Sequence, residues 1–247
     1  LSLWLRRYRP LSMRFPTPLV PARLLRRYKR FLADVELEVS GETVVAHCPN
    51  PGAMLGLAEP GMRVWLEPND DPGKKLKFGW RLVELPGGHV AGIDTGVPNR
   101  VVGEALTARV IPELAAWPDF RPEVRYAEKS RVDFLLSGEG MPDAYVEVKN
   151  VHLRRDGELA EFPDCVTTRG ARHLDDLAAM VGEGHRAVML YLVQRTDCAR
   201  FDLARDLDSA YGAAFDRARQ AGVEAICYGT TITTAGVELG APIPVLA

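Results

Sequence analysis

The sequence is first informative for what it has little of. Only four cysteines occur in 247 residues, and no two of them form a CxxC pair. This spacing argues against a zinc knuckle and against the disulfide framework of a small secreted domain. No apolar run approaches the roughly 20 residues that cross a bilayer, and no cleavable signal pattern follows the first residue. We therefore expect a cytoplasmic protein without a membrane segment.

Acidic residues are missing from the start of the chain. Residues 1–33 hold nine Lys or Arg and no Asp or Glu, although the whole chain has a net charge of -2. A basic front end of this kind attracts polyanions. Three of its basic residues precede the first methionine, Met13. We expect translation to begin at Met13 and residues 1–12 to be an extension without a role in the fold.

The basic segment 23–32, RLLRRYKRFL, keeps two aromatic rings beside its charges. Basic side chains neutralise backbone phosphates, and aromatic rings stack on unpaired bases. One interpretation is a stretch that follows a nucleic-acid backbone, and the other is a solvated basic strand edge or turn. The candidate phosphate contacts are Arg26, Arg27, Lys29 and Arg30.

The first part of the chain has the pattern of a small β-barrel. Residues 31–95 alternate five short β-type runs with turn sequences such as NPG, EPG and PGG. Short strands at this spacing predict a barrel, and the OB type is the obvious candidate. We expect the OB-like domain to span residues 13–95.

The remainder, residues 96–247, has the pattern of a compact α/β domain. Asn99 is a candidate N-cap of a first helix. Val102, Leu106 and Val110 would share the apolar face of that helix. The further expected elements are strands near 124–136 and 144–153, a helix near 168–182, a strand buried on both faces at 186–193, and a helix at 207–222.

Two strand-like runs in the stretch SRVDFLLSGEGMPDAYVEVKN, residues 130–150, carry carboxylates among apolar residues. Side chains two residues apart share a face of a strand, so Glu147 and Lys149 point one way while valines take the core. A hairpin that bends near residue 140 would bring Asp133 beside Glu147. The alternative is an exposed strand face, on which Glu-Val-Lys is common.

Paired carboxylates of this kind have a specific chemical use. They repel one another unless they are protonated or bridged by a cation. Mg²⁺ characteristically binds one or two carboxylates together with waters and phosphate oxygens. Lys149 could then stabilise charge on a phosphate or help to deprotonate the attacking water. Asp133, Glu147 and Lys149 are therefore the parts of a phosphodiester-cleaving site.

Four other residues are candidates for contacts with phosphate. Arg169 and His173 are spaced i, i+4 on one helical face. Asn50 lies in the turn HCPNPG, whose backbone amides could bind an anion. Arg131 is two positions from Asp133 on the same strand face. The alternatives are a solvated helix face, an ordinary structural turn, and a charge that only neutralises the carboxylates.

Several blocks of the sequence resemble one known family. SRVDF, YVEVKNVHL and FPDCVTTRGARHLDDL are similar, in this order, to the SfsA or sugar fermentation stimulation family. AHCPNPGAMLGL and VPNRVVGEAL agree with it in the front half, so the likeness runs from about Met13 to the C-terminus. The resemblance implies an N-terminal OB-like domain and a C-terminal restriction-endonuclease-like domain of the PD-(D/E)XK superfamily. It also implies DNA or RNA as the partner and metal-dependent nuclease chemistry.

The resemblance also assigns residues to that chemistry. Asp133 matches the metal-binding Asp of the superfamily, and Glu147 and Lys149 match its ExK pair. Glu104, which the residues alone leave as an exposed helical side chain, matches the acidic residue on the preceding helix. The implied ligands of Mg²⁺ or Mn²⁺ are Asp133, Glu147, Glu104 and the carbonyl of Val148.

Two departures and one competing hypothesis accompany the resemblance. Thr168 stands where we expect Glu, and NPGAM stands where we expect NTGRM, which removes a basic side chain from the expected nucleic-acid face. The competing hypothesis is a DNA-binding transcriptional regulator of sugar (maltose) metabolism whose nuclease fold is catalytically idle. A metabolic enzyme of sugar utilisation has no support, because no Gly-rich phosphate loop or nucleophile elbow occurs. The sequence leaves the oligomeric state open, a homodimer included.

Overall fold

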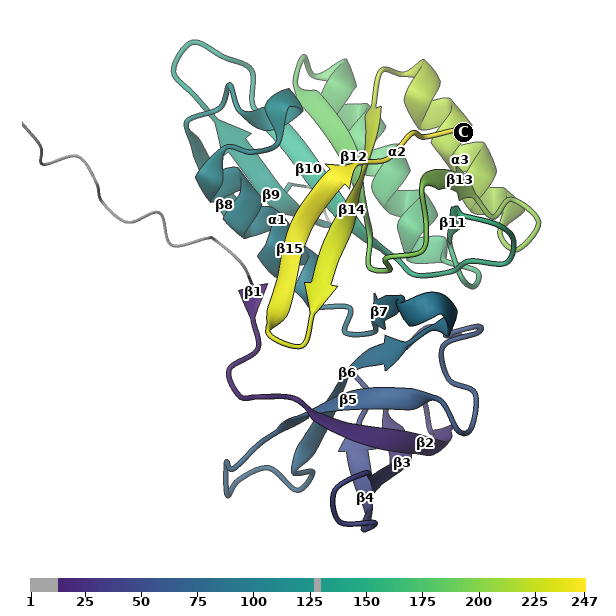
Figure 1. Cartoon of the computed structure of the whole chain (residues 1–247). Helices are drawn as coiled ribbons and strands as arrows, with labels where there is room; N and C mark the ends of the chain where they lie inside the picture. The colour runs from purple at the N-terminus through teal and green to yellow at the C-terminus, as the bar shows by residue number, and fades with distance from the viewer. Residues whose placement is uncertain (1–12, 127–129) are drawn as a thin grey trace, which may run out of the picture.

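The computed structural model describes residues 13–126 and 130–247, and the expected extension 1–12 lies outside them. Two large sheets organise the described residues: a closed barrel formed early in the chain, and an open sheet with helices formed by the remainder (Figure 1). The first strand, β1 (Met13–Arg14), does not belong to the barrel, because it pairs with β15 (Gly236–Pro242) of the open sheet. The chain therefore enters the barrel from the edge of the other unit.

Five strands close the barrel in the order β2-β3-β4-β6-β5 and back to β2. All neighbours are antiparallel except β4 and β6, whose parallel pairing completes the closure. A closed Greek-key arrangement of this size is the OB-type barrel that the spacing of short strands predicts. The barrel strands and the added strand β7 are β2 (Val20–Tyr28), β3 (Leu32–Leu37), β4 (Thr43–His47), β5 (Arg63–Pro68), β6 (Phe78–Glu84) and β7 (Val90–Gly92).

Alternating side chains fill the interior of the barrel. In β2, Ala22 and Leu24 are fully buried while Arg23 between them is exposed, as the two-residue period of a strand requires. Trp80 of β6 is also fully buried, and its indole Nε1 donates to the Leu82 carbonyl at 2.9 Å. The basic residues of β2 consequently stand on the outer surface of the barrel.

The open sheet has seven strands in the order β1-β15-β14-β12-β10-β9-β8. Its centre, β10, β12 and β14, is parallel, and the outer pairs are antiparallel. A separate parallel pair is formed by β11 and β13. The strands are β8 (Asp119–Arg125), β9 (Arg131–Ser137), β10 (Ala144–Val151), β11 (Leu159–Phe162), β12 (Arg186–Val193), β13 (Arg200–Leu203) and β14 (Glu224–Thr233).

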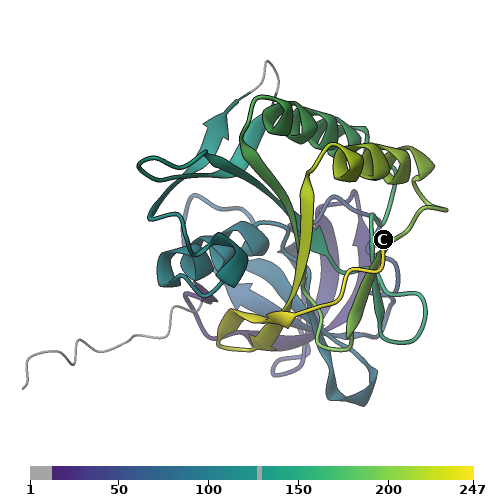
Figure 2. The same cartoon turned by 90° about the horizontal axis from the view of Figure 1, so that it is seen from above.

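Helices cover both faces of the open sheet. On one face lies α1 (Val97–Ala108), and on the other α2 (Thr168–Gly182) and α3 (Ser209–Gln220) lie side by side (Figure 2). Alternate residues of β12 belong to the two cores: Val188 packs with α1, and Met189 packs with α2 and α3. This double burial explains why the strand reads as an uninterrupted apolar run.

The start of α1 differs from the expectation. Gly96, not Asn99, holds the N-cap position, and Asp94 Oδ1 accepts the Gly96 N–H at 2.8 Å. Pro98 in the first turn favours an earlier start, because its fixed φ suits the first helical positions. Val110 lies beyond the helix and is 54% exposed, so its expected place on the apolar face is wrong. Asn99 is instead a helical residue whose side chain is available for other contacts.

A polar junction joins the barrel to the open sheet. Asp164 Oδ2 accepts the Met54 N–H of the barrel at 3.2 Å and lies 3.3 Å from His152 Nε2. Gln194 Nε2 donates to the Asp94 carbonyl at 3.1 Å. These partly buried and buried contacts pair polar groups across the junction and fix how the two units meet.

The cysteines agree with the expectation from their spacing. Cys48, Cys165, Cys198 and Cys227 are all free thiols. Within residues 13–126 and 130–247, no helix has the length and apolar character needed to cross a membrane.

Candidate active site

The candidate site lies where β9 and β10 separate. Their paired register ends at Val146, opposite Phe134. Beyond that point the acceptor for β10 is a side chain and not the backbone of β9: Asp133 Oδ2 accepts the Val148 N–H at 2.7 Å. The hairpin therefore brings Asp133 against the stretch of β10 that carries Glu147, as the sequence predicts.

Glu147 is only 3% exposed, and its two oxygens have different surroundings. Oε1 accepts from Lys149 Nζ at 2.7 Å and from His173 Nδ1. Arg169 Nε donates to His173 Nε2 at 3.2 Å, which assigns the ring proton to Nδ1. Oε2 is buried, and no described residue donates a hydrogen bond to it. One oxygen of a buried carboxylate is thus free to bind something else.

The carboxyl groups of Asp133 and Glu147 respond differently to burial. Burial and the nearby charge of Glu147 raise the pKa of Asp133 to about 6, against the opposing bonds from Val148 and Asn99. Burial also acts to raise the pKa of Glu147, but the bonds and charges of His173 and Lys149 outweigh it and lower that pKa. Glu147 therefore carries the negative charge, and a cation beside both groups would favour the ionised form of Asp133.

Helix α1 contributes an amide to the site, not a carboxylate. Asn99 Nδ2 donates to Asp133 Oδ1 at 2.7 Å. Glu104 comes five residues later, about 140° around the helix, and its charged neighbours are Arg100 and Glu238. The expected place of Glu104 beside the other carboxylates is therefore wrong, because the helical period turns it toward β15.

The residues present can be tested against a hard divalent cation. Across the described ranges, no group of three or more His, Cys, Asp or Glu side chains is arranged to hold a metal. Two carboxylates are nevertheless adjacent, and Oε2 of Glu147 is a buried acceptor with no donor among the described residues. Val148 lies in the stretch of β10 that has no partner on β9. Two carboxylates and a backbone carbonyl are oxygen ligands that suit Mg²⁺ or Mn²⁺.

Two further groups near the site have no signal in the sequence. The Tyr126 hydroxyl is buried without a hydrogen-bond partner in the described part of the chain. Burial, followed by the charges of Glu147, Asp176 and Asp133, raises the pKa of Tyr126. Ser130 donates from its hydroxyl to Asp176. A single tyrosine after a strand fits no motif, so only the fold reveals that it faces the carboxylates.

The basic residues predicted to contact nucleic acid separate into exposed and structural groups. Arg26 is 70% exposed, and its Nε donates to Asp34 at 2.7 Å. Lys29 and Arg30 are exposed where the chain turns from β2 into β3. Arg27 instead donates from its terminal nitrogen to the carbonyls of Asn50 and Gly52, at 2.8 and 2.9 Å. Its guanidinium therefore holds the neighbouring turn.

Asn50 and His173 are internal residues. Asn50 is 0% exposed, because its amide donates to the Ile93 carbonyl at 2.8 Å and its oxygen accepts the Gly52 N–H at 2.8 Å. His173 is equally enclosed and faces Glu147. Neither can reach a phosphate in this structure, so the expected nucleic-acid contacts of these two residues are wrong. Arg131 and Arg169 are exposed and retain that capacity.

The fold and the site together define a two-domain protein in which an OB-type barrel precedes an α/β domain with a carboxylate and lysine centre. Two family models match the same two parts: "SfsA N-terminal OB domain" over residues 25–93, and "Sugar fermentation stimulation protein RE domain" over residues 96–236. The chain belongs to the sugar fermentation stimulation protein (SfsA) family.

Individual relatives agree with the family models. Proteins named sugar fermentation stimulation protein homolog are 69% identical over 233 residues in Dinoroseobacter shibae and 65% identical over 234 residues in a Jannaschia species. These alignments cover 94% of this chain and 96% and 97% of the relatives. A solved structure of Pyrococcus furiosus SfsA in complex with Ca²⁺ is 26% identical, with a TM-score of 0.84, and the match covers 96% of this chain and 99% of that one. The predicted family and the predicted order of an OB domain and an α/β domain are confirmed.

Proposed function

We propose that the chain is a divalent-metal-dependent nuclease that hydrolyses phosphodiester bonds in DNA or RNA. The observation that carries the proposal is Glu147: a buried, ionised carboxylate with one oxygen lacking a donor among the described residues, next to Asp133. Buried polar atoms are nearly always satisfied, so an exception calls for an explanation. A bound cation supplies one, because it would satisfy that oxygen and relieve the repulsion between the two carboxylates.

The proposed ligands are the carboxylates of Asp133 and Glu147 and the carbonyl of Val148. Mg²⁺ or Mn²⁺ bound there would lower the pKa of a coordinated water and stabilise charge on the phosphoryl oxygens. The Ca²⁺ in the Pyrococcus furiosus relative supports this choice, since Ca²⁺ and Mg²⁺ are both hard cations that prefer oxygen ligands. The placement of the domain in the PD-(D/E)XK superfamily belongs to the same proposal.

The side chains around the ligands have separate roles. Lys149 keeps its ammonium group 2.7 Å from Glu147 Oε1, so a phosphate beside that carboxylate would meet a fixed positive charge. His173 and Asn99 orient the two carboxylates through their hydrogen bonds. Partners of this kind hold a ligand in one orientation and set its basicity.

Nucleic acid would reach the site along exposed basic residues. The loop between β2 and β3 carries Lys29 and Arg30, and Phe31 is exposed beside them. Arg131 and Arg169 are exposed on the elements that carry Asp133 and His173. Basic side chains with an aromatic ring bind backbone phosphates and stack on unpaired bases. DNA, RNA or both are therefore the proposed partners.

The decisive experiment incubates the purified chain with labelled DNA and RNA in Mn²⁺, Mg²⁺ or EDTA. Metal-dependent shortening of the label is expected for the wild type, and Lys149→Ala should lose it while retaining the fold and metal binding. Glu224→Gln is a matched control, because Glu224 pairs with Arg186 elsewhere in the same sheet. Unchanged cleavage by Lys149→Ala would reject the assigned role of the lysine.

A second candidate function is a nucleic-acid-binding regulator whose nuclease-type centre is idle. The observation in its favour is that Glu104 does not join Asp133 and Glu147, so the expected third carboxylate is missing from the site. In the same assay, a retarded but intact band in Mg²⁺ and in Mn²⁺ would select this function. A link to sugar metabolism rests on the family name alone.

A further inference from the structure

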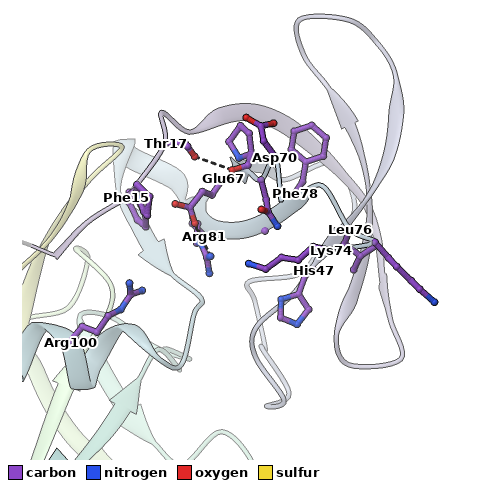
Figure 3. A pocket seen from close by; sticks show the side chains of 15 residues that line it. Phe15, Thr17, His47, Glu67, Asp70, Lys74, Leu76, Phe78, Arg81 and Arg100 are labelled. Carbon is purple, nitrogen blue, oxygen red and sulfur yellow. Dashed lines mark hydrogen bonds and ion pairs between the residues drawn. The ribbon is translucent and has the colours of Figure 1, made fainter. Parts of the chain in front are cut away.

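A cleft of about 790 Å³ lies between the barrel and helix α1, and neither Asp133 nor Glu147 lines it (Figure 3). Its walls come from strands β5 and β6 with the loop that joins them, from His47 at the end of β4, from residues 15–17 that lead into the barrel, and from Arg100 in the first turn of α1. This volume falls within the roughly 300–1,000 Å³ of pockets that bind small molecules. The cleft is large enough to hold a nucleotide.

One oxygen of a buried carboxylate in this cleft lacks a hydrogen-bond donor among the described residues. Glu67 of β5 lines the cleft and is 9% exposed. Its Oε2 accepts the Arg81 Nε–H at 2.8 Å and lies 2.7 Å from Arg81 Nη2 in an ion pair. Its Oε1 is buried, and none of the described residues donates to it. Because Arg81 also pairs with Asp94, its charge is already shared between two carboxylates. The free oxygen therefore calls for an N–H donor from a ligand.

Positive charge and aromatic rings occupy other parts of the same cleft. Lys74 is exposed and extends across the cleft toward Arg81 in Figure 3. Arg100 is half exposed, and its only ion pair in the described residues is a long one, 3.9 Å to Asp94. Phe15 and Phe78 are partly exposed on the walls. A phosphate can pair with the two cations, and a planar base can stack on an aromatic ring.

We propose that this cleft is a nucleotide-binding site with a preference for guanine. Guanine presents two adjacent donors, N1–H and N2–H, on its pairing edge. Glu67 lines the cleft, and its Oε1 is a buried acceptor without a donor among the described residues. Adenine offers one amino group on that edge, and uracil offers one ring N–H flanked by acceptor oxygens. Lys74 and Arg100 bind the phosphate. Both guanine donors can bond the Glu67 carboxylate, whereas the single donor of adenine or uracil lies beside an acceptor that the carboxylate repels, and this difference is the source of the expected preference.

One residue that lines the cleft is adjacent in sequence to a residue of the candidate active site. Arg100 borders the cleft, and the preceding residue, Asn99, bonds Asp133. The ligand is therefore either a free guanine nucleotide or one guanine of a strand that continues toward Asp133. Binding in the cleft does not require that the Asp133 and Glu147 centre cleaves anything.

Isothermal titration of the full chain in EDTA with GMP, AMP, UMP and inorganic phosphate tests the proposal. GMP should bind about tenfold more tightly than AMP or UMP. Lys74→Ala and Arg100→Ala should each weaken GMP binding about fivefold or more. Lys77→Ala is the matched control, because Lys77 lies on the same loop, bonds the Asp71 carbonyl and does not line the cleft. Glu67→Gln should retain phosphate-dependent binding and lose the preference among bases.

Several results would overturn the site. Equal affinity for the three nucleotides would refute the base preference, and absence of binding would refute the pocket. An effect of Lys77→Ala as large as that of Lys74→Ala would refute the assigned phosphate contacts. Since Glu67→Gln can disturb Arg81, its thermal melting must match that of the wild type, and the lysine and arginine variants test the site independently of it.

A second arm distinguishes the two sources of the nucleotide. Trinucleotides with one central guanine should bind more tightly than GMP if the guanine belongs to a strand, and no more tightly if the ligand is a free nucleotide. Repeating both arms with Glu147→Gln separates this site from the proposed nuclease. Binding that persists in that variant supports the cleft even if the chain cleaves nothing.

Discussion

Two pairs of histidine and carboxylate lie largely out of solvent in the described part of the α/β domain, and they differ in one respect. At the domain junction, His152 and the Met54 N–H both contact Asp164, and neither oxygen of Asp164 is a buried acceptor without a donor in the described ranges. At the candidate site, His173 and Lys149 share one oxygen of Glu147 and leave the other without a donor. The two pairs thus differ in that Glu147 keeps one buried oxygen without a hydrogen-bond donor among the described residues, whereas Asp164 does not.

The difference separates a structural pair from the pair for which we propose a function. Burial acts to raise the pKa of Asp164, but the hydrogen bond and charge of His152, with the Met54 N–H, lower it to about 2. A satisfied carboxylate of this kind contributes to stability through the bonds it already makes. An unsatisfied one costs stability and is retained where a ligand completes it. The comparison is tested most directly by variants of the two carboxylates, since one should change activity and the other should change stability.

The largest expected effect belongs to Glu147→Gln. Glutamine keeps the shape of the side chain and removes the charge that two donors and the proposed cation require. We expect metal-dependent cleavage to fall about 10²–10³-fold, equivalent to about 3–4 kcal/mol of transition-state stabilisation. The thermal midpoint should change little, because the wild-type carboxylate is incompletely satisfied. Initial rates on labelled DNA and RNA, with Glu224→Gln beside them, measure the effect, and wild-type rates would remove Glu147 from the mechanism.

Asp164→Asn should have the opposite consequence. It removes the charge that His152 and Met54 contact at the junction, so the free energy of unfolding should fall by about 2–3 kcal/mol. Affinity for Mn²⁺ should be unchanged, because Asp164 does not contact the Asp133 and Glu147 centre. Urea unfolding and metal titration of the same preparation check both statements. A loss of metal binding without a loss of stability would reverse the two roles.

The pair of His152 and Asp164 also predicts how the free energy of unfolding changes at acid pH. The pKa of Asp164 is about 2 in the folded protein and 3.8 ordinarily, so an unfolded chain takes up the proton first as the pH falls. The contribution of Asp164 is complete above about pH 4 and disappears as the pH approaches 2, a loss of about 2 kcal/mol. Urea unfolding between pH 5 and pH 2.5 should show this loss in the wild type and lack it in Asp164→Asn.

A surface carboxylate provides the control for the acid response. The hydrogen bonds of Arg155 also lower the pKa of Asp206 to about 2, but Asp206 is exposed, where solvent screens the pair. Asp206→Asn should therefore follow the wild-type curve. If Asp206→Asn and Asp164→Asn behaved alike, burial would not be the reason for the difference.

Local patterns in the sequence predict much of this arrangement. The apolar run 186–193 coincides with β12, and the amphipathic segment 168–182 coincides with α2. Alternation along two neighbouring strands is sufficient to predict that Asp133 and Glu147 face one another. These features depend on the two-residue and 3.6-residue periods of the backbone, which neighbouring residues determine.

Other features depend on how the elements pack, and no local pattern contains that information. The i, i+4 spacing places Arg169 and His173 on one helical face but does not reveal that α2 turns this face toward Glu147. Asn99 is of a residue type favoured at the N-cap, yet the helix begins earlier, with Pro98 in its first turn and Asp94 accepting the N–H of the N-cap Gly96. Glu67 reads as one more exposed strand residue, and only the folded structure shows that it is buried against Arg81.

The smallest expected effect tests whether His173 acts through Glu147. His173→Phe keeps a ring of similar size and removes the donor to Glu147, whereas His173→Asn retains a donor near the position of Nδ1. Loss of a residue that orients a metal ligand typically costs 10–100-fold, and Lys149 still bonds the same oxygen, so we expect about a tenfold fall in cleavage for His173→Phe. His173→Asn should recover most of it. If both variants melted early and lost activity equally, His173 would support the core alone, as His152 supports the junction, and the contrast between the two pairs would fail.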